Sequence, residues 1–282
     1  MTRPLPPSPY AEVIGDPIAH SKSPVIHGYW LEQLEIDGRY TAMHVRPEGL
    51  ETYLEARRED PDWRGCNVTI PHKQAVIPLL DCVNPRAASI GAVNTIWRDG
   101  KGRLCGTNTD VDGVAEAIAG LNHNGCRAVV LGAGGAARSA FAHLAGLGCA
   151  STKVLARNRV RAAEALEDCG LAAQVLPFEG DTGAFVGAGL VINATQLGMQ
   201  GQRSMPDFVL SEIAQTAGDC LVFDMVYAPL QTDLLSAAQR QGRHSVGGLI
   251  MLVGQARSAF ARFFGATPPP DHDAKLYERL TG

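Results

Sequence analysis

The chain of 282 residues carries a formal net charge of −4 at pH 7, and 45% of its residues are hydrophobic. That length supplies enough material for two ordinary domains, each with its own core. A weakly acidic chain has no long-range attraction for phosphate backbones or anionic lipids. We therefore expect no nucleic acid and no membrane among its partners.

No stretch approaches the roughly 20 apolar residues that cross a bilayer, and the opening MTRPLPPSPY is proline-rich where a signal peptide would be apolar. We expect a cytoplasmic protein. The seven cysteines are scattered and include no CxxC pair, which is typical of a reducing compartment. Each is interpreted as a small buried hydrophobic residue without a role. The eight histidines have no HExxH-like spacing, so no metal site is predicted.

Short apolar runs alternate with helix-like segments along the first half of the chain. We expect strands at residues 11–14, 40–45, 65–70 and 92–97, and a helix over residues 23–34. The alternation of strands with helices indicates an α/β fold, in which helices cover both faces of parallel sheet.

The second half continues this alternation. RAVVLGAGG, AARSAFAHLAGLG and the run 153–156 predict a strand, a helix and a second strand, which together form a βαβ unit. Further strands are expected at 190–193 and 220–226, and a long apolar helix at 247–264.

The clearest local motif is LGAGGAARS at residues 131–139, a strand-to-helix turn rich in glycine. Such a turn lets backbone N–H groups and a helix N-terminus face a pyrophosphate. Ala137 stands where a strict GxGxxG motif has its third glycine, and alanine is tolerated there. The residues that we expect to contact a dinucleotide in this turn are Gly132, Ala133, Gly134, Gly135 and Ala136.

The next strand ends at Arg157, not at the acidic residue that would bind an adenosine ribose 2′-hydroxyl. An arginine there suits a 2′-phosphate, and Arg161 in the same turn adds charge. The sequence therefore favours NADP (NADPH) over NAD.

Polar clusters in the first half lie at the ends of expected strands, where open α/β sheets bind their ligands. In GDPIAHSKSP, Ser21 and Ser23 precede a helix and suit a carboxylate. Thr69 and Lys73 lie in NVTIPHK, where the lysine is a proton donor candidate for a ketone oxygen. Asn94 in GAVNT and Asp110 in GTNTD suit a polyhydroxylated ring.

These motifs, together with INATQLGM, DMVYAPLQT and GGLIMLVGQA, resemble the shikimate dehydrogenase family in order and approximate spacing over nearly the whole chain. The resemblance implies a two-domain protein with an N-terminal α/β substrate domain and a Rossmann-type doubly wound NADP-binding domain. The expected substrate domain comprises residues 1–109 with 246–282, and the cofactor domain comprises residues 110–245.

The resemblance also implies roles for single residues. Ser21 and Ser23 would hold the substrate carboxylate, and Lys73 and Asp110 would flank the reacting oxygen. The remaining expected substrate contacts are Thr69, Asn94, Tyr227 and Gln255, and the remaining cofactor contacts are Thr195, Met225 and Gly248. The family often reads Asn-Arg-Thr at the cofactor turn where this chain has Ala156, Arg157 and Asn158, a departure that predicts weaker cofactor binding without changing the cofactor.

The implied activity is reversible reduction of 3-dehydroshikimate to shikimate by NADPH, in the biosynthesis of chorismate and the aromatic amino acids. Three alternatives stay open: a quinate/shikimate dehydrogenase that uses NAD, an aminoshikimate-type relative of a secondary pathway, and a non-catalytic NADPH sensor on the same fold. The sequence leaves open whether the protein is a monomer or a homodimer.

Overall fold

The computed structural model describes residues 8–120 and 125–282, so most of the proline-rich opening lies outside the described residues. The chain divides into two compact units. The first unit contains Met1–Thr109 and Gln255–Gly282, and the second contains Asp110–Gly254. The chain returns to the first unit at Gln255, within helix α10 (Gly248–Phe264), whereas the expected return was at residue 246.

The described part of the first unit is built on one six-stranded sheet, in the order β2-β1-β3-β5-β6-β4. Its strands are β1 (Tyr10–Gly15), β2 (Arg39–His44), β3 (Trp63–Val68), β4 (Cys82–Val83), β5 (Thr95–Arg98) and β6 (Leu104–Thr107). Its helices are α1 (Ser23–Gln33), α2 (Leu50–Glu59), α3 (His72–Ala75), α4 (Pro85–Ile90), α11 (Asp273–Thr281) and the part of α10 from Gln255 onward.

This sheet is mixed, whereas the alternation of strands and helices predicted parallel pairing. β1 pairs in parallel with β2 and β3, but β5 runs antiparallel to both β3 and β6. β5 and β6 are joined by a tight turn in which Asp99 Oδ1 accepts hydrogen bonds from the N–H groups of Lys101 and Arg103. A connection that short can join only antiparallel strands.

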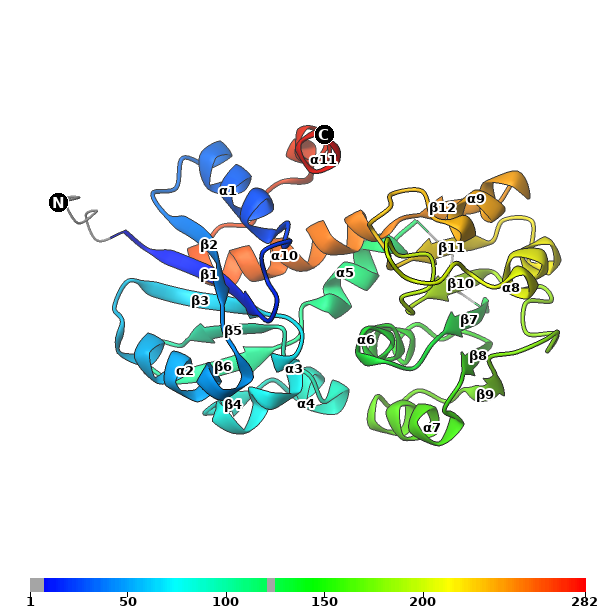
Figure 1. The fold of residues 1–282 in the computed structure, drawn as a ribbon, viewed down its shortest axis with the longest axis horizontal. Helices are drawn as coiled ribbons and strands as arrows, with labels where there is room; N and C mark the ends of the chain where they lie inside the picture. Colours follow the sequence, from blue (N-terminus) through cyan, green and yellow to red (C-terminus); the bar gives the residue numbers. More distant parts are fainter. Residues whose placement is uncertain (1–7, 121–124) are drawn as a thin grey trace. The chain divides into compact units, whose positions relative to one another are not determined.

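Two apolar layers enclose this sheet. On one face, α2 buries Leu50, Tyr53 and Leu54 against a cluster that includes Trp63 and Ile96. The other layer is aromatic and includes His27 and Trp30 of α1 and Phe260 of α10. Figure 1 shows α2 on the opposite side of the β1–β3 strands from α1.

The second unit has six parallel strands in the order β12-β11-β10-β7-β8-β9. They are β7 (Arg127–Leu131), β8 (Ser151–Ala156), β9 (Gln174–Pro177), β10 (Leu190–Asn193), β11 (Leu221–Asp224) and β12 (His244–Val246). Counted from β7, this is the strand order of a Rossmann fold, whose ligands bind where the order reverses, here between β7 and β10.

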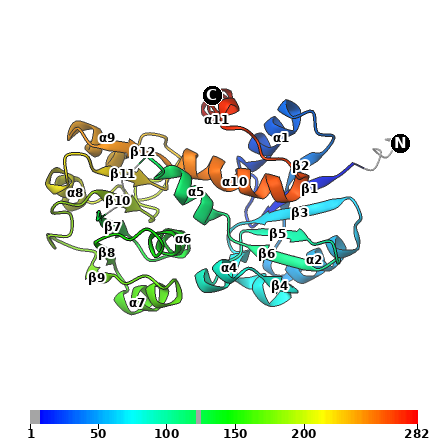
Figure 2. The same cartoon turned by 180° about the vertical axis from the view of Figure 1, so that it is seen from behind.

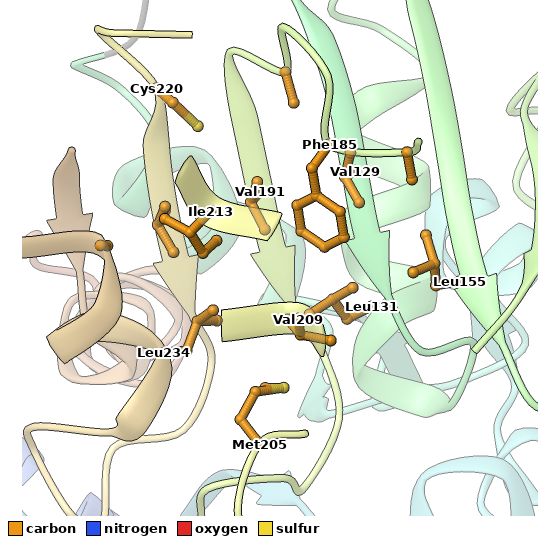
Figure 3. Close-up of a cluster of buried hydrophobic side chains, with 14 residues drawn as sticks. Val129, Leu131, Leu155, Phe185, Val191, Met205, Val209, Ile213, Cys220 and Leu234 are labelled. Carbon is orange, nitrogen blue, oxygen red and sulfur yellow. The ribbon is translucent and has the colours of Figure 1, made fainter. Parts of the chain in front are cut away.

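Helices cover both faces of this second sheet. They are α5 (Asp110–Ala117), α6 (Gly135–Leu144), α7 (Arg159–Asp168), α8 (Asp207–Glu212) and α9 (Asp233–Arg240). Figure 3 shows one face, where Val209 and Leu234 pack over Val129 and Val191. Because side chains alternate along a strand, the buried residues between those strand positions, such as Val130, face the other helical layer. Figure 2 gives the view from behind.

The structure corrects the interpretation of the cysteines. Cys82 and Cys105 form a disulfide with an S–S distance of 2.05 Å. They lie directly opposite each other where β4 pairs with β6. The two cysteines are 23 residues apart in the sequence, and no motif there links them. Only the pairing of β4 with β6 brings the two thiols together, so the sequence did not indicate the disulfide.

Candidate functional site

The serine loop follows β1. Asp16 N–H donates to the carbonyl oxygen of Ile70, so this loop is tied to the segment that follows β3. Ser23 is buried and begins α1, and its N–H donates to Ser21 Oγ at 3.3 Å. The Ser21 hydroxyl therefore satisfies an N–H group at the start of the helix. Helix capping does not account for the Ser23 hydroxyl.

Thr69 and Lys73 follow the neighbouring strand, β3. Thr69 packs so closely on the end of β1 that a β-carbon placed on Gly15 would lie 2.6 Å from its methyl group. Lys73 is half-buried in the short helix α3, and its carbonyl oxygen accepts from Val93 N–H at 2.8 Å. That bond places the lysine backbone beside the segment that carries Asn94.

Asn94 is 3% exposed and its side-chain oxygen is the centre of a buried polar cluster. Oδ1 accepts from Thr109 N–H at 2.7 Å and from Thr95 Oγ1 at 2.9 Å. Thr109 Oγ1 lies 3.5 Å from Gln255 Oε1, so the cluster reaches α10. These bonds fix the orientation of the Asn94 amide and bring it close to Gln255.

Three further residues of this cluster were missed as site residues. Asn67, Thr95 and Thr109 are all buried, and each lies inside a motif that the sequence analysis quoted. Asn67 Nδ2 donates to Thr95 Oγ1 at 3.1 Å and to the Asn94 carbonyl oxygen at 3.3 Å. The sequence did offer a signal for these three residues: each is a polar residue near the end of an apolar run, and each is close to a residue already assigned to the site.

In the second unit, the predicted glycine turn joins β7 to α6. Gly132 has φ 97°, which favours glycine. Gly134 and Gly135 begin α6, and a β-carbon on either would meet nothing within 4 Å. Ala137 is fully buried in the position for close helix–strand packing. Ala133 is half-buried and Ala136 is exposed, so this turn can receive a pyrophosphate.

Arg157 follows the end of β8 and is exposed, as is Arg161 in the first turn of α7. Asn158 lies between them as the N-cap of α7, and its side chain accepts from Arg161 N–H at 3.0 Å. The departure from the family pattern therefore has a local structural role, because an asparagine cap satisfies one of the open N–H groups of the helix.

The loops after β10 and β11 are joined by buried polar groups. Asn193 Nδ2 donates to Asp224 Oδ1 at 2.9 Å, while Asn193 Oδ1 accepts from the Thr195 hydroxyl at 2.7 Å. Thr232 donates to Asp224 Oδ2 at 2.7 Å. Burial raises the pKa of the Asp224 carboxyl, against the opposite effect of these hydrogen bonds. The result is a fixed position for Thr195 at the reversal of strand order.

Met225 and Gly248 meet at the start of α10. The Met225 N–H donates to the carbonyl oxygen of Asn193 at 3.0 Å. A β-carbon on Gly248 would overlap the Met225 carbonyl oxygen, so only glycine lets the helix start this close to the β11 loop. Thr195, Met225 and Gly248 thus belong to adjoining loops of the second unit.

Asp110 and Tyr227 belong to the second unit, whereas the other expected substrate contacts belong to the first. Asp110 is the first residue of α5 and directly follows Thr109 along the chain. Tyr227 follows β11 and is half-buried, and burial raises its pKa. Their positions relative to Lys73 remain a prediction.

Two classes of site receive no support from the described residues. No group of three or more His, Cys, Asp or Glu side chains in residues 8–120 and 125–282 is placed to hold a metal ion. None of the helices in that part of the chain is long and apolar enough to cross a membrane.

The chain is similar over nearly its whole length to known shikimate dehydrogenases. Residues 13–96 match the family model of the shikimate dehydrogenase substrate binding domain. The shikimate dehydrogenase (NADP(+)) of Sphingopyxis alaskensis is 46% identical over 269 residues, which cover 95% of this chain and 96% of that protein. Shikimate 5-dehydrogenase from Thermus thermophilus, solved with NADP(H) and shikimate, has a TM-score of 0.83 at 35% identity and covers 96% of this chain and 99% of its own.

A reductase with a different name has the same fold. The ligand-free 5-ketofructose reductase of Gluconobacter sp. strain CHM43 has a TM-score of 0.87 at 27% identity, covering 97% of this chain and 99% of its own. Fold alone therefore does not decide the substrate. Sequence identity of 46% over 95% of the chain does decide the family. This chain belongs to the shikimate dehydrogenase family.

Proposed function

We propose that this protein catalyses the reversible, NADP-dependent interconversion of 3-dehydroshikimate and shikimate. The observation that carries the proposal is the buried cluster around Asn94, where amide and hydroxyl groups converge at the edge of the sheet that also bears Thr69 and the serine loop. Such groups suit a ring that carries several hydroxyls. Because the chain belongs to the shikimate dehydrogenase family, we take this ring to be that of shikimate.

In the first unit, the proposed substrate domain, Ser21 and Ser23 hold the substrate carboxylate. Thr69, Asn94 and Gln255 bind or orient the ring hydroxyls. The backbone hydrogen bond from Asp16 to Ile70 supports this arrangement, because it keeps the loop after β1 beside the loop after β3. Tyr227 is a further proposed contact, and it belongs to the second unit.

Lys73 and Asp110 are the proposed catalytic residues. The lysine donates a proton, or a strong hydrogen bond, to the carbonyl oxygen as that oxygen gains negative charge. Both groups act at the same oxygen in this proposal.

The second unit is the proposed NADP-binding domain. When bound, the reduced cofactor supplies a hydride to the carbonyl carbon. The glycine turn from Gly132 to Ala136 receives the pyrophosphate, and Arg157 and Arg161 pair with the 2′-phosphate. Thr195, Met225 and Gly248 line the same cofactor region, at the reversal of strand order.

The alternatives differ in measurable ways. A quinate-using relative with NAD would carry an acidic residue at the end of β8, where this chain has Arg157. A non-catalytic sensor would bind NADPH without turnover and would not need Lys73. An aminoshikimate-type enzyme would share the ring-binding motifs and would be separated by its substrate.

The test is the change in absorbance of the reduced nicotinamide while purified protein oxidises shikimate or quinate, each with NADP or NAD. Activity confined to shikimate with NADP supports the proposal. Equal activity with quinate or NAD would assign the chain to the quinate-using relatives. Reduced cofactor that binds with no turnover of either compound would leave the sensor as the explanation.

We also propose that the protein works in the cytoplasm. Support comes from the five cysteines outside the disulfide, three of which are buried, whereas the Cys82–Cys105 disulfide weighs against it. Fractionation of the source cells, with the shikimate-dependent activity followed in each fraction, tests the location. Activity confined to an extracytoplasmic fraction would overturn it.

A further inference from the structure

Tyr40 is a buried tyrosine that the proposed reaction does not use. It is 7% exposed, while every other residue of β2 is exposed. Its hydroxyl donates to Asn67 Oδ1 at 2.7 Å. The Ser23 side chain also hydrogen-bonds to the Tyr40 hydroxyl. Tyr40 therefore lies between a proposed carboxylate contact and the buried cluster around Asn94.

The hydrogen bonds beyond Tyr40 have a single direction. Because Asn67 Oδ1 accepts from Tyr40, its Nδ2 group is left to donate to Thr95 Oγ1 at 3.1 Å. The Thr95 hydroxyl has one proton, which it donates to Asn94 Oδ1 at 2.9 Å. The Asn94 amide thus turns its acceptor oxygen into the protein, and Nδ2 is its donor side.

A buried ring holds Tyr40 in place. His27 stacks on it with ring centroids 3.9 Å apart and an interplanar angle of 5°. His27 is fully buried, and neither of its ring nitrogens has a hydrogen-bond partner among the described residues. The imidazole therefore acts as a flat packing surface that fixes the Tyr40 ring. Burial raises the pKa of Tyr40, so its hydroxyl keeps the proton that it donates.

We propose that Tyr40 is a positioning residue for substrate binding: its hydroxyl, together with the Thr109 N–H, holds the Asn67–Thr95–Asn94 hydrogen bonds in one direction and so presents the Asn94 amide as a donor to a ring hydroxyl. The proposal rests on the proposed function, because Asn94 is there a substrate contact. Tyr40 itself does not touch the substrate in this proposal.

The chain contains a matched control. Tyr53 is 8% exposed in the same unit, and its hydroxyl also donates a buried hydrogen bond, to Glu12 Oε2 at 2.7 Å. Tyr40→Phe and Tyr53→Phe each remove one buried hydroxyl and keep the ring. Both changes should lower stability, but only Tyr40→Phe should change substrate binding.

The experiment compares steady-state kinetics of the wild type, Tyr40→Phe and Tyr53→Phe with shikimate and NADP. We expect Tyr40→Phe to raise KM for shikimate about tenfold. A tenfold change corresponds to about 1.4 kcal/mol, which is the usual net contribution of one hydrogen bond. Its KM for NADP should stay unchanged and its kcat within about threefold. Tyr53→Phe should lower the urea midpoint and leave both KM values at the wild-type level.

An unchanged KM for shikimate in Tyr40→Phe, or an equal rise in Tyr53→Phe, would overturn the positioning role. A crystal structure of Tyr40→Phe gives a second readout that needs no activity. We expect the Asn67 amide to turn or shift there, and an unmoved amide would also overturn the proposal. Failure of the proposed function is separate, since it appears as a wild-type protein that does not oxidise shikimate.

Discussion

A β-carbon on Gly132 would lie 2.8 Å from Cγ2 of Thr195, because the turn after β7 passes directly against the loop after β10. These two strands are neighbours at the point where the order of the second sheet reverses. The glycine turn is therefore shaped on one side by packing within the unit. On the other side, Gly134 opens onto space.

Gly132→Ala and Gly134→Ala should separate stability from cofactor binding. Gly132→Ala meets Thr195 and places a side chain at φ 97°, so we expect a loss of about 1–3 kcal/mol in the free energy of unfolding. Gly134→Ala should leave that free energy within about 0.5 kcal/mol of wild type. Its methyl group should still raise KM for NADP, because the backbone must approach the pyrophosphate there. Urea unfolding measures the stability of both variants, and initial rates measure their KM for NADP. A large stability loss in Gly134→Ala with an unchanged KM for NADP would contradict the prediction.

Arg157→Ala should weaken binding of NADP but not of NAD. The exposed guanidinium at the end of β8 is placed to pair with a 2′-phosphate, which NAD lacks. We expect KM for NADP to rise about tenfold or more, as for loss of a charged hydrogen bond. Asn158→Ala is the control, because removing the α7 cap should cost about 1 kcal/mol of stability without changing the preference between cofactors. Equal losses for both cofactors in Arg157→Ala would refute the phosphate contact.

Local patterns in the sequence predicted much of this fold. The glycine turn and the strand at residues 190–193 lie where they were expected, and the Rossmann order follows from repeated strand–helix units. These features depend on hydrophobic period and turn chemistry, which are local properties of the chain. The predicted positions of Ser21, Ser23, Thr69 and Lys73 at strand ends also follow from that local pattern.

Features that depend on distant residues were not predicted. β5 pairs antiparallel with β3, where parallel sheet was expected, and no strand was predicted at β6. The Cys82–Cys105 disulfide forms only because β4 pairs with β6. The hydrogen bond from Tyr40 to Asn67 joins residues 27 positions apart on different strands, and nothing in the sequence indicated it. Pairing partners across a sheet leave little trace in a single sequence.

Lys73→Ala should lower kcat by about 10²- to 10⁴-fold, the usual contribution of a positioned general acid. KM for shikimate should change much less, because the carboxylate and hydroxyl contacts remain. Lys101→Ala, an exposed lysine in the β5–β6 turn, is the control and should behave like wild type. Initial rates at saturating shikimate and NADP measure the effect. A Lys73→Ala enzyme with near-normal turnover would exclude this residue from the chemistry.

His27 should make stability depend on pH. Complete burial lowers its pKa from 6.5 to about 3. Between these values the unfolded chain binds a proton that the folded protein does not. The contribution of His27 is therefore fully present above pH 6.5 and is lost as the pH falls toward 3, by about 1.4 kcal/mol per pH unit.

His27→Phe keeps a ring on Tyr40 and removes this titration. The loss of unfolding free energy from pH 7.5 to pH 5 should be smaller in the variant than in wild type by about 2 kcal/mol. Urea unfolding of both proteins at the two pH values gives this difference. A loss of packing in His27→Phe that is the same at both pH values cancels from it. Equal pH dependence in the two proteins would show that His27 is not held neutral by burial.

The Cys82–Cys105 disulfide should stabilise the first unit. It closes a segment with a sequence separation of 23 residues, which corresponds to about 3 kcal/mol in the loop-entropy model. Alkylation of unreduced protein followed by peptide mapping should give one linked pair, Cys82 with Cys105. Cys126 and Cys149, whose sulfur atoms lie 3.2 Å apart without a disulfide, should carry the alkyl label. Reduction should then lower the urea midpoint of wild type but not of Cys82→Ser. If the unreduced protein is labelled at all seven cysteines, the disulfide is absent from the isolated protein and the expectation of a reducing compartment holds.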